Sequence, residues 1–179
     1  MDSDNRLALP IMSRRSFRAL QKVQGSFEIP PLELVDTHPF LVKEEDRSSP
    51  FKQASGIDRF GVPNVATEAT RAEARRLTVN LNMQAIVRAA GGERHIRQKL
   101  VLSSRQIRWI VGENKLPALP SGFWWHFFVT GNNDEILAVS ICDKKDGYHL
   151  HLLETEKRSE PHQPQVYGVG NYFIVRTPN

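Results

Sequence analysis

The sequence predicts an α+β fold: a small helical unit, followed by an antiparallel β-hairpin or meander and preceded by a poorly ordered N-terminal arm. Three observations support this prediction. Apolar residues lie three or four positions apart over 96–110, which indicates two short helices joined by a tight turn. Beyond Pro120 the segments become aromatic and β-prone, as expected of strands. Prolines recur through residues 1–66 too often for long regular elements.

Residues 1–66 are predicted to form a flexible arm, and residues 67–179 a domain. Within the arm, Ser13 is a suitable N-cap for a short basic helix over 14–24. The acidic and then Ser/Pro-containing stretch over 44–50 is typical of a linker. Apolar groups at 27–29 and 32–35 could dock on the domain or on a protein partner.

The first elements of the domain are predicted from propensity and period. A helix of good helix formers is expected over 67–76, and alternation of apolar and polar residues over 77–82 predicts a short strand. A second helix is expected over 83–90. Gly91 and Gly92 should end it, because glycine readily takes the left-handed conformation found just after a helix.

The next two helices carry the main functional prediction. Ser103 is a good N-cap for the second of them, and Gln106 completes a possible capping box. A tight turn would place Leu102 under both helices. The apolar positions that would pack between them are Ile96, Leu100, Leu102, Ile107 and Ile110. This pattern is typical of a helix-turn-helix, whose second helix commonly lies in the major groove of DNA.

The C-terminal half is predicted to be antiparallel β-structure. Strands are expected over 123–130, 135–142 and 148–154, separated by turn clusters at 131–134 and 143–147. Segments 166–169 and 172–176 form either a last hairpin or, from Gly170 on, a single strand. The aromatic strand over 123–130 carries much apolar surface, so we expect a homodimer through these strands.

Positive charge is concentrated on the predicted helical unit. Residues 71–115 contain ten Lys or Arg and three Glu, a net charge of +7, while the whole chain has a net charge of +4. The remainder of the chain is therefore at −3. A local basic patch is typical of proteins that bind the phosphate backbone of nucleic acids.

Two patterns in this chain resemble the Cro and YdaS-like helix-turn-helix regulators of phages and prophages. The first is the glycine pair Gly91-Gly92, the apolar positions given above and the closing run Asn114-Lys115-Leu116-Pro117. The second is the order of a strand, three helices and a hairpin over about 77–142. The resemblance implies a sequence-specific, double-stranded-DNA-binding transcriptional regulator, acting as a dimer through its hairpin strands.

The predicted DNA contacts follow from the helix-turn-helix geometry. Arginine and serine side chains on the second helix would meet base edges, and residues at the two ends of the motif would meet the backbone. The residues expected at base edges are Ser103, Ser104, Arg105, Arg108 and Trp109. The residues expected at the backbone are Arg94, His95 and Lys115.

Two alternatives use the same residues differently. In a ribbon-helix-helix protein, Thr78, Asn80 and Asn82 would enter the major groove from a strand. In a non-catalytic interaction protein, such as an assembly subunit or secreted effector, the basic helices would bind a protein or RNA partner. The long N-terminal arm fits this second class at least as well as a regulator.

Other chemistry has weaker support in the sequence. His149 and His151 alternate, so both project from one strand face, and with His126 and Cys142 they could hold a metal; paired surface histidines are more common. Cys142 with His126 as nucleophile and base lacks any sign of an activated thiol. We expect no catalytic residue, metal or cofactor. With a single cysteine and neither a membrane span nor a signal peptide evident, a cytoplasmic protein is expected.

Overall fold

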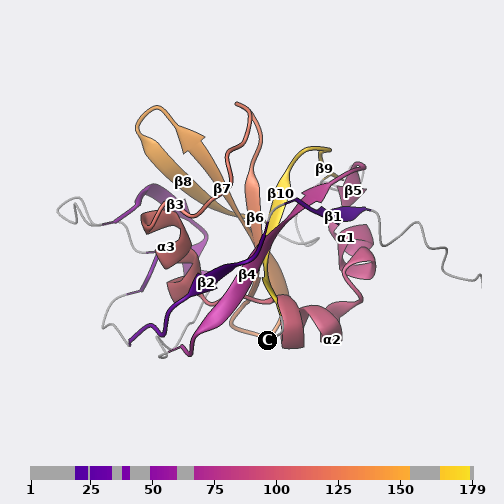
Figure 1. Cartoon of the computed structure of the whole chain (residues 1–179), viewed down its shortest axis with the longest axis horizontal. Coiled ribbons are helices and arrows are strands. Elements are labelled where there is room, and N and C mark those ends of the chain that lie inside the picture. Colours follow the sequence, from indigo (N-terminus) through magenta and orange to yellow (C-terminus); the bar gives the residue numbers. More distant parts are fainter. Residues whose placement is uncertain are drawn as a thin grey trace, which may run out of the picture.

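The computed structural model describes residues 19–23, 25–33, 38–40, 49–59, 67–153 and 166–177. In this part of the chain, strands dominate and form an eight-stranded mixed sheet and a separate two-stranded sheet (Figure 1). The helices are short and lie against the large sheet. The predicted fold class is therefore wrong, because the helices pack against a large sheet and do not form a helical unit with a β-hairpin appended.

The large sheet has the strand order β1-β4-β10-β6-β7-β8-β3, and β2 also pairs with β4. Its strands are β1 (Leu20–Lys22), β2 (Phe27–Ile29), β3 (Phe51–Ser55), β4 (Thr70–Leu77), β6 (Trp125–Thr130), β7 (Ile136–Lys144), β8 (Gly147–Leu153) and β10 (Tyr172–Thr177). The pairs β10–β6 and β3–β8 are parallel, and the other pairs are antiparallel. The small sheet joins β5 (Leu81–Asn82) to β9 (Val166–Tyr167).

Three strands of the large sheet lie within the predicted flexible arm. β1 pairs with one end of β4 and β2 with the other end, and β3 pairs with β8. Residues 20–22 are strand, so the helix predicted over 14–24 is wrong there, and residues 14–18 lie outside the described part. The helix predicted over 67–76 is also wrong, since β4 occupies 70–77. The described segments of residues 1–66 thus share one sheet with the predicted domain.

The helices are α1 (Met83–Ala89), α2 (Glu93–His95), the π-helix η3 (Ile96–Leu100) that continues α2, and α3 (Ser104–Gly112), with a short 3-10 helix η2 (Ile57–Arg59). α1 confirms the helix predicted over 83–90, with Gly91 after it at φ 100°. The capping box of α3 is also confirmed: the Gln106 N–H donates to Ser103 Oγ, and the Ser103 N–H donates to Gln106 Oε1.

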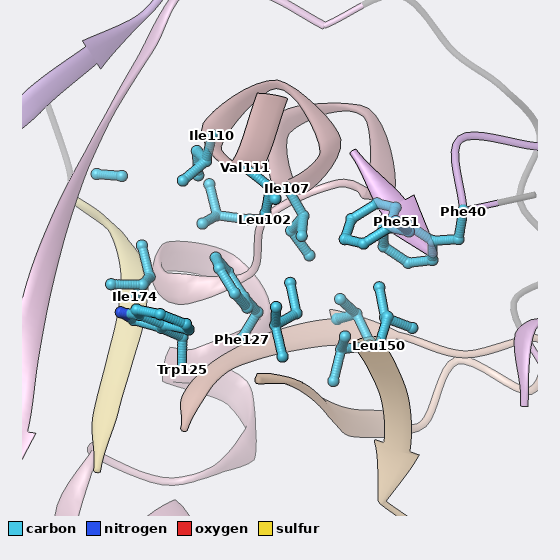
Figure 2. Close-up of a cluster of buried hydrophobic side chains, with 14 of the residues drawn as sticks. Phe40, Phe51, Leu102, Ile107, Ile110, Val111, Trp125, Phe127, Leu150 and Ile174 are labelled. Carbon is cyan, nitrogen blue, oxygen red and sulfur yellow. The ribbon is translucent and has the colours of Figure 1, made fainter. Parts of the chain in front are cut away.

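Hydrophobic cores lie on both faces of the sheet, because neighbouring residues along each strand point to opposite faces. The first core packs α3 and Leu102 against Trp125, Phe127 and Ile174. Figure 2 shows Phe40 and Phe51, from the N-terminal segments, on the side of this cluster next to Ile107 and Leu150. The second core packs α1 and η3 against the other face, and its buried residues include Leu77, Ile86, Ile96, Leu100, Phe128, Phe173 and Val175.

The two helices of the predicted helix-turn-helix belong to different cores. Ile96 and Leu100 pack in the second core, whereas Leu102, Ile107 and Ile110 pack in the first. A helix-turn-helix requires its two helices to pack on each other, and here the sheet separates them. The helix-turn-helix prediction is therefore wrong, although both helices exist.

The C-terminal strands are confirmed, but their roles differ from those predicted. β6 lies between β10 and β7, and its residues 125–129 are buried within this one chain. β9 pairs with β5, so residues 166–176 do not form the hairpin; the other predicted alternative, a single strand beyond Gly170, is confirmed by β10. The homodimer remains a prediction, but the aromatic strand that suggested it is already covered.

Candidate functional site

The predicted DNA-contacting residues of α3 lie beside the first core. Ser103 caps the helix, Ser104 is buried, and Trp109 packs against the first core. Arg105 and Arg108 are half-buried, and the Arg108 guanidinium donates to the carbonyl oxygen of Pro39 at 3.0 Å. The α3 surface is therefore partly covered by an N-terminal segment.

The remaining predicted contacts lie elsewhere. Lys115 is exposed beyond the end of α3. Arg94 and His95 are exposed on α2, which leads into η3 on the second-core face. The structure thus divides the eight residues between two sides of the sheet.

Two of the three polar residues of the ribbon-helix-helix alternative stabilise local structure through hydrogen bonds. Asn82 caps α1 by accepting a hydrogen bond from the Ala85 N–H at 2.9 Å. Asn80 accepts a hydrogen bond from the Val169 N–H at 2.8 Å, next to the small sheet. Both side chains are therefore engaged within the chain.

Part of the positive charge of residues 71–115 is neutralised in the fold. Arg71 pairs with Glu28 at 3.1 Å, and Arg97 pairs with Asp134. Glu73, whose side chain is only 8% exposed, pairs with Arg75 and with Lys22. Burial alone raises the pKa of Glu73, but the hydrogen bonds from Lys22 and Arg75 outweigh it and lower the pKa below its ordinary value.

Several unneutralised cations gather on α1, α2 and η3. Arg88, Arg94, His95 and Lys99 are exposed there and form no ion pair with any described residue; we call them the helical basic surface. Arg176 from β10 reaches the end of η3, where its guanidinium donates to the carbonyl oxygens of Gln98 and Lys99. A cation at a helix C-terminus is favoured by the helix dipole.

A second polar constellation lies on β8. His149 Nε2 is 2.9 and 3.0 Å from the two carboxylate oxygens of Asp146, and His151 Nδ1 is 3.2 Å from Ser55 Oγ on β3. The two imidazole centroids are 6.5 Å apart, and the Trp124 ring lies 5.5 Å from that of His151. We call Ser55, Trp124, Asp146, His149 and His151 the histidine-pair site.

Charged neighbours give this site distinct electrostatics. The hydrogen bond with His149 lowers the pKa of Asp146, so this carboxyl is ionised at neutral pH. Burial, and then the nearby His149 and Lys144, lower the pKa of His151 and favour its neutral form. The Lys52 side chain of β3 packs closely over Gly147. A Cβ atom added at position 147 would lie only 2.7 Å from Lys52 Cγ.

A buried histidine lies further along the same face. Ser55, His151, Ser140 and His126 are successive partners across β3, β8, β7 and β6. His126 Nδ1 is 2.6 Å from Ser140 Oγ, and both side chains are buried. Burial lowers the pKa of His126 to about 3, so this imidazole is neutral and belongs to the core.

Cysteine chemistry and a multidentate metal site find little support in the described residues. Burial raises the pKa of the Cys142 thiol, which is the opposite of activation. Within the described part of the chain, no three His, Cys, Asp or Glu side chains are arranged to hold one metal ion.

Sequence inspection identified His149 and His151 but missed their partners. Asp146, three residues before His149, was assigned only to a turn, although the spacing is visible in the sequence. Ser55 lies 96 residues from His151, and only the parallel β3–β8 pairing brings them together.

The chain matches no protein-family model, and comparisons with curated proteins and with solved structures find no significant match. None of the helices in the described residues has the length and apolar character needed to cross a bilayer.

Proposed function

We propose that this protein binds nucleic acid through contacts between the helical basic surface and the sugar-phosphate backbone. One observation carries the proposal: Arg88, Arg94 and Lys99 are exposed on adjoining helices and have no anionic partner among the described residues. Arg71 and Arg75, elsewhere in 71–115, are paired within the sheet.

The local structure supports this use of the helices. Ile86, Ile96 and Leu100 anchor α1 and η3 in the second core, so the charged side chains are held on the outer surface. Arg176 adds a cation at the end of η3. Several exposed cations on a rigid support release counterions on contact with a polyanion, which supplies most of the affinity in sequence-independent binding.

The proposal differs from the function implied by the resemblance. A Cro-like regulator would place α3 in the major groove, but α3 packs on the first core and Arg108 contacts Pro39. The proposed contacts are made instead from the other side of the sheet. The shared chemistry is a phosphate backbone, and the experiment separates DNA from RNA.

The test measures binding by fluorescence anisotropy over a series of salt concentrations. The probes are a labelled random-sequence DNA duplex and a labelled single-stranded RNA. Three proteins are compared: the unmodified chain, Arg94→Ala/Lys99→Ala, and a control, Arg71→Ala/Lys145→Ala, which loses the same two charges at other exposed positions. Thermal melting confirms that all three are folded.

The helical variant should bind the preferred probe more weakly and reduce the slope of log K against log salt by about 2, since each lost phosphate contact contributes about 0.9. The control should keep the slope of the unmodified protein. Equal losses in both variants would show that net charge alone attracts the probe. Failure of the unmodified protein to bind either probe at low salt would overturn the proposal and leave an acidic protein as the partner to test.

A further inference from the structure

We propose that His149 and His151 form a general acid–base pair that cleaves RNA by transesterification to the neighbouring ribose 2′-oxygen. This inference concerns β3 and β8 and does not depend on the helical basic surface. It rests on the hydrogen-bonded geometry of the two imidazoles and on the groups that surround them.

Each imidazole has one ring nitrogen held by the protein. His149 Nε2 contacts the Asp146 carboxylate, and His151 Nδ1 contacts Ser55 Oγ. Nδ1 of His149 and Nε2 of His151 make no hydrogen bond to a described residue. A partner on one nitrogen orients the ring and leaves the other nitrogen to exchange a proton with a substrate.

The two rings have different surroundings. The Asp146 carboxylate holds Nε2 of His149, which leaves Nδ1 of that ring to donate a proton to a substrate. His151 is partly buried and lies near Lys144, which favours a neutral ring that can accept a proton at Nε2. The other charged groups near the pair are Asp143 of β7 and Lys52 of β3. A proton donor and a proton acceptor can therefore be supplied from one strand face.

The neighbouring side chains fit a ribonucleotide. Lys52 and Lys144 provide positive charge for a phosphate, and the Trp124 ring beside His151 offers an aromatic surface on which a base can stack. The centroid separation of 6.5 Å is of the size needed for two rings to contact opposite oxygens of one phosphodiester. RNA also brings its own nucleophile, the 2′-hydroxyl.

The reaction balances without another reagent. His151 Nε2 accepts the proton of the 2′-hydroxyl as that oxygen forms a bond to phosphorus. The bond from phosphorus to the 5′-oxygen breaks, and His149 Nδ1 donates its proton to the leaving oxygen. The products are a 2′,3′-cyclic phosphate and a 5′-hydroxyl, and proton exchange with water restores both histidines. Ser55 and Asp146 act as positioning residues.

The experiment uses the full chain and a dinucleoside monophosphate, uridylyl-3′,5′-adenosine, followed by chromatography and mass spectrometry. Cyclic phosphate should form from this substrate and not from its 2′-O-methyl analogue. His149→Ala and His151→Ala should each lower the rate at least about 100-fold, the scale expected for loss of a general acid or base. Gln84→Ala, which changes an exposed residue of α1 outside the site, should keep the rate. Identical purification of every variant excludes a contaminating nuclease as the cause of a difference.

A pH profile separates proton transfer from a structural role. The rate should fall on the acid side as His151 becomes protonated, and Asp146→Asn should lower the rate by removing the carboxylate that positions the His149 ring. Ser55→Ala, an exposed change, should lower the rate less than His151→Ala does. The absence of cyclic phosphate, or a His151→Ala variant that melts normally and cleaves at the unmodified rate, would overturn the inference. Cleavage of the dinucleotide and binding of the labelled duplex are separate measurements on the same protein, so the two proposals can fail separately.

Discussion

The backbone N–H of Leu102 donates a hydrogen bond to the carbonyl oxygen of Phe128 at 3.1 Å. This bond marks the place where the chain passes from one face of the sheet to the other. Leu100 packs in the second core and Leu102 in the first. The short connection over 101–103 therefore joins a helix on one face of the sheet to a helix on the other. In a helix-turn-helix, residues 101–103 would form the turn. Here they follow an extended path, which is why the two helices do not meet.

Two adjacent serines should respond differently to truncation. Ser103→Ala removes the N-cap of α3 and should lower the free energy of unfolding by about 1 kcal/mol. Ser104→Ala should be neutral or slightly stabilising, because Ser104 Oγ is buried and has no hydrogen-bond partner among the described residues. Urea unfolding measures both. Similar losses for the two variants would contradict the capping geometry.

Removal of residues 1–66 should abolish cooperative folding. That deletion takes away β1, β2 and β3 together with the buried side chains of Ile29, Phe40 and Phe51. Loss of one large buried side chain costs about 2–5 kcal/mol, so three of them rival the whole stability of a typical domain, about 5–15 kcal/mol. A chain lacking only residues 1–18 is the control and keeps every described strand. Circular dichroism melts that coincide for residues 67–179 and the full chain would show an independent domain.

Stability should fall as the pH drops below about 6.5, in part because of His126. Its ordinary pKa is 6.5, and burial lowers the pKa to about 3 in the folded chain. Between these values the unfolded chain binds a proton that the folded chain does not, so acid favours unfolding. The variant His126→Phe/Ser140→Ala removes both polar groups of the pair and should lose less stability between pH 7 and pH 4.5. Parallel pH dependences for variant and unmodified protein would place the effect at other groups.

Arg108 should support the fold more than it supports DNA binding. Arg108→Ala removes the hydrogen bond to the Pro39 carbonyl and should lower the free energy of unfolding by about 1.5–3 kcal/mol. Lys115→Ala, at an exposed position, should change it by less than about 0.5 kcal/mol. Binding to a selected DNA duplex is measured in parallel. A relaxed base preference in Arg108→Ala without loss of stability would favour the base contact predicted from the sequence.

Local signals in the sequence predicted several local structures correctly. Ser103 and Gln106 form the capping box, and Gly91 follows α1, because these features depend on residues a few positions apart. For residues 70–77, the same local signals gave the wrong prediction. Their Ala, Glu and Arg residues favour helix, but pairing with β1, β2 and β10 on both sides makes them a strand.

The arrangement of the sheet and its sites could not be predicted in the same way. The alternation of His149 and His151 is visible in the sequence, whereas the contact with Ser55 depends on a parallel pairing between distant segments. The charge of 71–115 was evident, but its division between paired and exposed cations depends on Glu28 and Asp134, which lie outside that segment. Non-local contacts of this kind leave no periodic signal.

The strand that is last in the described sequence, β10, lies in the middle of the large sheet, between β4 and β6 (Figure 1). During synthesis, β4 and β6 therefore leave the ribosome well before the strand that joins them. Until residues 172–177 emerge, the nascent chain would expose two unpaired strand edges, together with residues such as Phe127 that are buried in the folded protein. This order delays completion of the sheet until residues 172–177 emerge, and in that interval chaperones that cover exposed strands can bind the nascent chain.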